Sequence, residues 1–182
     1  INVIFYYASE IFQSAGYDVK GVMLNIVITG VVMLFFTFLA LGTVDKWGRK
    51  TLMLTGSAGL ALSYALVGLS YHSGRTGILV VTLTVTAIAF YSFSLAPVTW
   101  VLLSEIFPNR IRGAAMSISV FALWVGCFTL SYSFPTLNAT LGSAYTFWLY
   151  GAICAFGFIF ILLALPETKN KSLEEIERQM GL

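Results

Sequence analysis

The chain has 182 residues, of which 58% are hydrophobic and only 10% charged, with a formal net charge of +2 and a mean hydropathy of +0.88. Soluble domains carry about 25% charged residues, so this composition excludes an ordinary soluble domain and indicates a membrane protein. The basic residues are scattered over several short segments. This scatter excludes a concentrated basic face of the kind that binds nucleic acid.

Apolar stretches long enough to span a bilayer dominate the sequence. A helix needs about 20 predominantly apolar residues to cross the hydrocarbon. The stretches that qualify are 21–44, 51–71, 77–104, 113–137 and 145–165. A shorter apolar segment, 1–15, has no initiator Met, basic region or cleavage site, so we interpret it as the rest of a truncated helix and not as a signal peptide. We therefore expect an all-α polytopic membrane bundle over 1–165 and a tail over 166–182.

Basic residues predict the orientation of the bundle in the membrane. Segments on one side hold Lys46, Arg49, Lys50, Arg110, Arg112, Lys169, Lys171 and Arg178, whereas the opposite side holds Lys20 and Arg75. Cytoplasmic loops carry an excess of Lys and Arg, so the first side and the C-terminus are predicted to be cytosolic. In the tail, Ser172 and Glu175 have capping-box spacing, which predicts a short amphipathic helix.

A few polar and aromatic residues interrupt the apolar segments. Asn2 and Tyr6 are one helical turn apart and so face the same way. A buried amide needs a partner, which is either a solute or a neighbouring helix, and the sequence leaves both open. Pro97 is expected to bend or break its helix. Trp100 follows it at a depth where a tryptophan is either core or a ligand contact, because most membrane tryptophans lie at the interface.

Two further patterns concern packing and chemistry. Thr55, Gly59 and Ser63 recur at every fourth position and predict a close helix–helix approach. Cys127 and Cys154 lie in different apolar stretches and are interpreted as soft packing residues. The sequence has no Cys/His cluster with metal-ligand spacing and no nucleophile–base pair. We therefore predict no metal, no cofactor and no enzymatic activity.

The cytosolic turn Asp45–Lys50 is short and charged, and Gly48 is expected to permit the chain reversal. Arg49 and Lys50 are expected to reach the carbonyl end of a neighbouring helix. Taken alone, the turn fits either an ordinary basic loop or part of a charged lock.

Four segments together resemble the sugar porter family of the major facilitator superfamily. They are I-N-V-I-F-Y-Y at 1–7, V-D-K-W-G-R-K at 44–50, P-V-T-W-V-L-L-S-E-I-F-P-N-R-I-R-G at 97–113 and P-E-T-K-N-K-S-L-E-E-I at 166–176. The similarity is greatest to bacterial xylose- and galactose-type proton symporters. It implies the C-terminal six-helix bundle of such a transporter, with its first helix truncated, in the cell membrane.

The resemblance also implies residue roles. Asn2, Tyr6 and Trp100 would contact the sugar, and Tyr7 and Pro97 would belong to the gate. The implied cytosolic charge lock consists of Asp45, Arg49, Glu105, Arg112 and Glu167. The sequence departs from the family at Met33 and Leu123, where relatives carry an amide, and at Ala96, where they carry Gly; a drier site is expected.

The function expected from this resemblance is transport of a hexose or pentose by alternating access, as proton symport. The partners would be the monosaccharide, the lipid bilayer and the missing N-terminal six-helix half. Buried ionisable groups mark proton relays, and these apolar stretches contain none, so any coupling group would lie in the missing half. The alternatives are a sugar-sensing receptor or a non-transporting membrane subunit on the same scaffold.

Overall fold

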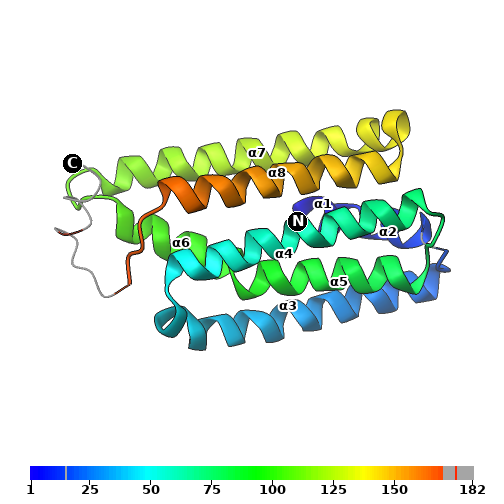
Figure 1. Cartoon of the computed structure of the whole chain (residues 1–182), viewed down its shortest axis with the longest axis horizontal. Helices are drawn as coiled ribbons and strands as arrows, with labels where there is room; N and C mark the ends of the chain where they lie inside the picture. The colour runs from blue at the N-terminus through cyan, green and yellow to red at the C-terminus, as the bar shows by residue number, and fades with distance from the viewer. Residues whose placement is uncertain (15, 170–174, 176–182) are drawn as a thin grey trace.

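The computed structural model describes residues 1–14, 16–169 and 175. This part of the chain is all-α, as expected, and contains no strand. Its helices are α1 (Asn2–Tyr6), α2 (Ala8–Ser14), α3 (Val19–Trp47), α4 (Arg49–His72), α5 (Ile78–Phe93), α6 (Leu95–Ile106), α7 (Arg112–Leu141) and α8 (Ser143–Ala164). They run roughly parallel or antiparallel to one long axis (Figure 1).

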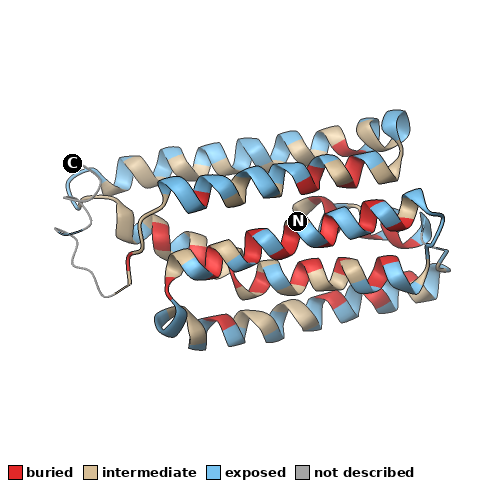
Figure 2. Cartoon of the chain, in the orientation of Figure 1, coloured by how far each residue is buried: buried red, intermediate tan, exposed pale blue. Residues whose placement is uncertain are grey.

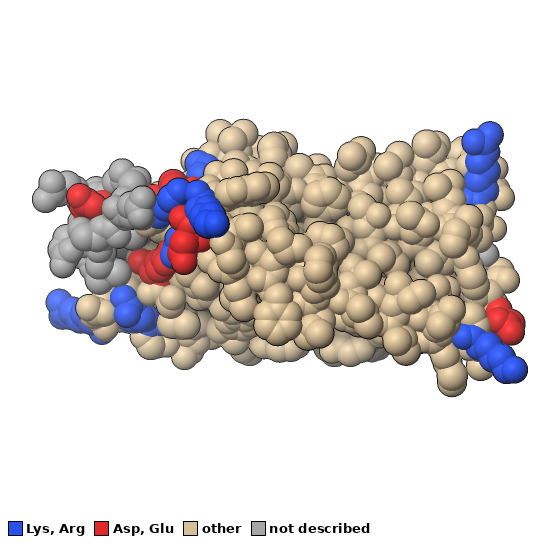
Figure 3. Space-filling view, turned by 90° about the horizontal axis from the view of Figure 1, so that it is seen from below, with Lys and Arg blue, Asp and Glu red and all other residues tan. Residues whose placement is uncertain are grey.

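Five spans are long and apolar enough to cross a membrane: α3, α4, α5 with α6, α7 and α8. Each overlaps one of the predicted stretches, with ends that differ by a few residues. Charged side chains lie at the two ends of the molecule, with a broad uncharged belt between them (Figure 3). We call the end that carries the α3–α4 turn and the α8 terminus the charged end.

Two of the turns between long helices are shorter than expected. Gly48 alone separates α3 from α4, and Gly142 alone separates α7 from α8. Both glycines have positive φ, 89° and 84°, a conformation that side chains with a Cβ rarely adopt. One such residue reverses the chain, so the residues around it stay helical.

Two of the expected helices are interrupted. The segment 1–15, expected as one helix, divides at Tyr7 into α1 and α2. The break expected at Pro97 lies earlier, at Ser94, whose backbone angles are not helical. A proline displaces the carbonyl four residues before it, here Phe93, and its own missing N–H is harmless in a first helical turn. Pro97 therefore lies in the first turn of α6, and the break falls before it.

The core lies around α4. Half of the apolar window of α4 is buried, against none of the corresponding window of α7. Buried residues accordingly gather on α4 and its neighbours, while α7 is largely exposed (Figure 2). At Gly59, a Cβ atom would lie 2.4 Å from the ring of Phe90 on α5, so only glycine fits this approach. The predicted small-residue stripe is shifted: Gly56, Gly59 and Ser63 are buried, and Thr55 is exposed.

The polar side chains of the helices are mostly satisfied locally. Many Ser and Thr hydroxyls donate to the carbonyl three or four residues before them, as Thr37 does to Met33. Such bonds remove the need for a partner in hydrocarbon. The predicted amphipathic helix of the tail falls largely on residues 170–174 and 176–182, which lie outside the described residues.

Candidate functional site

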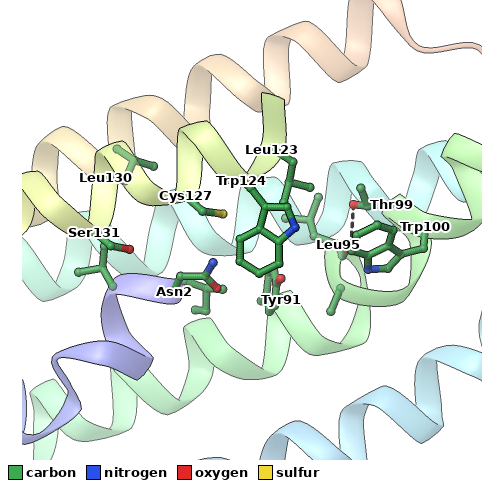
Figure 4. Close-up of a pocket in the computed structure, with 13 residues that line it drawn as sticks. Asn2, Tyr91, Leu95, Thr99, Trp100, Leu123, Trp124, Cys127, Leu130 and Ser131 are labelled. Carbon is green, nitrogen blue, oxygen red and sulfur yellow. Dashed lines mark hydrogen bonds between the residues drawn. The ribbon is translucent and has the colours of Figure 1, made fainter. Parts of the chain in front are cut away.

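A hollow of about 360 Å³ lies between α1, the α5–α6 break and α7. The interruption between α5 and α6 at Ser94 lies beside it. The lining residues are Ile1, Asn2, Val3, Tyr91, Leu95, Ala96, Thr99, Trp100, Leu123, Trp124, Cys127, Leu130 and Ser131. Figure 4 shows these side chains converging from three directions.

Two of the three residues expected to contact a solute are brought together here. Asn2 enters from α1 and Trp100 from α6, and both line the hollow. Tyr6 shares α1 with Asn2 but does not line the hollow, and its side chain is 66% exposed. The structure thus joins the amide and the indole from distant parts of the sequence and leaves the phenol on the surface.

The two expected gate residues lie at helix interruptions. Tyr7 is the residue at the α1–α2 break, and its ring packs on Phe134 of α7 with centroids 4.8 Å apart. Pro97 does not line the hollow, although its neighbours Ala96 and Thr99 do. A gating role for either residue therefore stays a prediction.

Sequence reasoning missed three lining residues. Trp124 on α7 lies opposite the α6 wall, with 54% of its surface exposed, and Tyr91 and Ser131 add hydroxyls. Trp124 carried the same signal as Trp100, a tryptophan in mid-span, and could have been found by it. Tyr91 and Ser131 carried none, because hydroxyls on apolar helices are common and only tertiary packing selects the ones that face a cavity.

The residues that depart from the family pattern fall into two groups, those that line the hollow and one that does not. Leu123 and Ala96 line the hollow, so an apolar surface stands where a more polar or smaller residue was expected. Met33 on α3 instead packs, partly buried, against the hydrophobic core. The expectation of a drier site therefore rests on Leu123 and Ala96.

A second arrangement, at the charged end, is built on Arg49. Its guanidinium donates to Glu105 at 2.9 Å and pairs with Asp45 at 2.9 Å. The Arg49 side chain is 14% exposed and that of Glu105 28%, whereas Asp45 is 78% exposed. Pairing in water contributes little, so the Glu105 contact is the stronger of the two.

Glu167 joins this arrangement by capping a helix. Its carboxylate accepts from the backbone N–H groups of Arg49 and Lys50, at 3.0 and 3.2 Å, which are the first two residues of α4. Gly48 offers no capping side chain, and a Cβ there would meet Glu167 at 2.6 Å. A carboxylate from the segment after α8 thus satisfies the free N–H groups and the positive end of the α4 dipole.

Thr168 and Lys50 complete the contacts, and we name Asp45, Arg49, Glu105, Glu167 and Thr168 the Arg49 cluster. Thr168 is buried and donates to Glu105 at 2.6 Å, a contact that sequence reasoning missed. The Lys50 ammonium donates to the Leu162 carbonyl at the end of α8, as expected.

Arg112 was expected in the charge lock, and the structure does not place it there. Its Nε donates to the Phe107 carbonyl, and it forms no salt bridge with any residue in the described ranges. Arg112 is the first residue of α7, so its bond to Phe107 lies within the turn between α6 and α7. Within the same ranges, no three His, Cys, Asp or Glu side chains gather into a group able to hold a metal ion.

Comparison with known proteins places this arrangement among transporters. A family model described as "Sugar (and other) transporter" matches residues 1–180. The chain is 39% identical to the D-xylose-proton symporter of Escherichia coli (strain K12) over 97% of its length, which is 37% of that protein. It is 40% identical to the arabinose-proton symporter of Bacillus subtilis (strain 168), covering 98% of this chain and 39% of the relative.

Solved structures agree. The chain matches the proton:xylose symporter bound to 6-bromo-6-deoxy-D-glucose with a TM-score of 0.89 and 38% identity, over 98% of this chain and 39% of that one. It matches the inward-open xylose transporter from E. coli with a TM-score of 0.86. The chain thus spans less than half the length of the relatives that it matches.

Proposed function

Because this chain belongs to the sugar (and other) transporter family, we propose that it forms the C-terminal half of a transporter that moves a monosaccharide across a membrane by alternating access. The observation that carries the proposal is the uncharged hollow lined by Asn2, Trp100 and Trp124. A neutral polyol needs hydrogen-bonding groups and an aromatic face for its C–H groups, and it needs no charge. These side chains supply that combination.

The hollow is incomplete in this chain, which supports a second bundle as partner. The apolar window of α7 buries nothing, and the two indoles of the hollow remain about half exposed. A membrane-spanning surface of this kind is covered by lipid or by protein. A six-helix half that faces α7 would close the hollow around a solute.

The orientation that we propose places the charged end in the cytosol. By the helix bounds, that end carries Lys46, Arg49, Lys50, Arg110, Arg112 and Lys169, and the opposite end carries Lys20 and Arg75. Positive charge concentrates on the cytosolic side of membrane proteins. The segment after α8, and with it Glu167 and Thr168, would therefore lie in the cytosol.

In this mechanism the Arg49 cluster biases the inner side toward its closed state. It connects the end of α6, through Glu105, with the start of α4 and the segment after α8. Opening toward the cytosol would move α6 and break the contact between Arg49 and Glu105. A partly exposed pair is worth about 1 kcal/mol, which shifts a two-state equilibrium without freezing it.

Proton symport, as in the relatives described above, needs a titratable group at membrane depth. Within the described spans, no Asp, Glu, Lys, Arg or His side chain lines the hollow, so we assign that group to the partner half. This chain would contribute to sugar binding and to the inner closure.

The experiment that tests the proposal is uptake of labelled pentoses and hexoses by the full-length protein in proteoliposomes, with and without an imposed proton gradient. We expect saturable uptake that a proton gradient drives above the external concentration. Binding without uptake would indicate a sugar receptor instead, and neither binding nor uptake would contradict the proposal.

A further inference from the structure

At the end of the bundle opposite the charged end, the short helix α2 is tied to the end of α4 (Figure 1). The hydroxyl of Tyr71, in the last turn of α4, lies 2.8 Å from the hydroxyl of Ser14, the last residue of α2. The Ser14 hydroxyl donates its only proton to the Ile11 carbonyl at 2.8 Å, so it accepts from Tyr71. The Tyr71 hydroxyl also donates to the Ile11 carbonyl, at 3.3 Å. These oxygen atoms form one small network that joins the two helices.

The network caps α2. Ile11 and Ser14 belong to the last four residues of α2, whose carbonyls have no partner within the helix. Tyr71 lies 57 positions from Ser14 in the sequence, and its hydroxyl meets this end of α2 from a different helix. Tyr71 therefore caps the C-terminal end of α2 much as Glu167 caps the N-terminal end of α4, and the two caps lie at opposite ends of the bundle.

The closely packed α4 side of the bundle holds the Tyr71 ring in place. The ring stacks on that of Phe147 on α8, with 5.8 Å between centroids and 7° between planes. Phe147 is itself buried and packs against Tyr64 of α4, with 6.1 Å between ring centroids. The Tyr71 hydroxyl is thus oriented before it meets α2, and the tie costs little side-chain entropy.

The helix α2 has one face that is packed and one that is free. Ala8, Ile11 and Phe12 are buried against the bundle, whereas Glu10 and Gln13 are exposed. A partner half can reach α2 only from the exposed face. A movement of α2 toward that partner would pivot at the break at Tyr7 and carry Ser14 away from Tyr71.

We propose that the Tyr71 hydroxyl is a latch of the outer side, which holds α2 against its own bundle and is released when the outer side closes over a solute. Tyr71 is then a positioning residue, because it acts through α2 and does not contact the solute. The latch biases the outer side toward its open state, as the Arg49 cluster biases the inner side toward its closed state. The proposal rests on the proposed function, since it adds a control point to the same alternating-access cycle.

Removal of one oxygen atom tests the latch. Tyr71→Phe keeps the ring on Phe147 and leaves the bond from Ser14 to Ile11 in place, so only the tie between α2 and α4 is lost. Cys127 lines the hollow, and it is kept as the sole cysteine of the full-length protein. Its labelling rates with an impermeant thiol reagent are measured from each side of the membrane. We expect the ratio of the outer rate to the inner rate to fall by roughly fivefold, the shift that one hydrogen bond produces.

Two further variants locate the effect. Ser14→Ala removes one of the two acceptors of Tyr71, so we expect a smaller fall, and adding it to Tyr71→Phe should lower the ratio no further. Tyr145→Phe is the matched control. Tyr145 lies in the first turn of α8 at the same end of the bundle, is 55% exposed and forms no hydroxyl hydrogen bond with any described residue.

Each outcome of the labelling experiment decides the proposal. A ratio in Tyr71→Phe equal to that in Tyr145→Phe would overturn the latch, and so would a higher ratio, which would mean that the tie favours closure of the outer side. General loosening of the fold would raise labelling from both sides, leave the ratio unchanged and count against the latch as well.

Failure of the latch and failure of the proposed function are distinguishable, because the labelling requires no sugar. Labelling of Cys127 from both sides, with the same ratio in every variant, contradicts the latch alone. Labelling from one side only in every variant, together with absence of uptake, contradicts alternating access and the latch with it.

Discussion

The α4 side and the α7 side of this bundle differ in how closely their helices pack. On one side, α4 packs closely against α5 and α8, and half of its apolar window is buried. On the other side, α7 buries nothing in its window, and the helices beside it are interrupted at Tyr7 and Ser94. The comparison indicates that most of the packing that holds the bundle together lies on the α4 side, and it supports the proposal that the α7 side faces a solute and a partner.

The largest effect is expected from a substitution on the α7 side that leaves the α4 side unchanged. Trp100→Ala removes an indole from the wall of the hollow, so we expect sugar binding to weaken by tenfold or more, because a large aromatic contact is lost. Isothermal titration of the purified full-length protein measures it. Trp47→Ala is the control, since Trp47 is comparably exposed on α3 and lies outside the hollow. Unchanged affinity in Trp100→Ala would show that this indole only packs.

The next largest effect is expected from a substitution on the α4 side. In Gly59→Ala, the new Cβ would lie 2.4 Å from the Phe90 ring, so we expect the free energy of unfolding to fall by about 1–3 kcal/mol. Gly126→Ala on α7 meets nothing within 4 Å and should be neutral or slightly stabilising. The apparent Tm in detergent reports both. Equal Tm changes in the two variants would remove the distinction between the sides.

A smaller effect is expected where the two sides are joined. Glu105→Gln removes the charge at the end of α6 that holds Arg49 at the start of α4. We expect the inner side to open more often, roughly by fivefold, while sugar affinity stays within about threefold. Cys127 lines the hollow and reports this through its labelling by an impermeant thiol reagent from the cytosolic side, with the other cysteines replaced by Ser. Unaltered labelling together with unaltered transport would contradict the lock.

The smallest effect is expected from a second substitution in the Arg49 cluster. Asp45 also pairs with Arg49, but it is 78% exposed. Asp45→Asn should therefore change Cys127 labelling by less than about threefold, since exposed pairs contribute little. A change as large as that of Glu105→Gln would mean that pairing with Arg49, and not burial, sets the strength of the lock.

Much of the candidate site could be read from residue types. Trp100 stood out because a mid-span tryptophan near a proline is unusual, whereas the charge lock that includes Arg49 and Glu105 was implied by the family resemblance. Tyr91, Ser131 and Thr168 could not be predicted, because each is an ordinary hydroxyl until packing brings it beside Asn2 or Glu105. Arg112 donates to the Phe107 carbonyl and does not join the Arg49 cluster, because sequence position predicts the end of the bundle at which a residue lies and not the direction of its side chain.

The sequence by itself determined that this is an all-α membrane bundle of long apolar helices, and it predicted the reversal at Gly48. These features follow from local physics, namely the length of apolar runs and the conformational freedom of Gly48. Only the tertiary structure decided which side of each helix is buried, that the α5–α6 break falls at Ser94, and that Glu167 caps α4. These outcomes depend on packing between different helices, and the Glu167 cap joins residues more than a hundred positions apart, which no local pattern encodes.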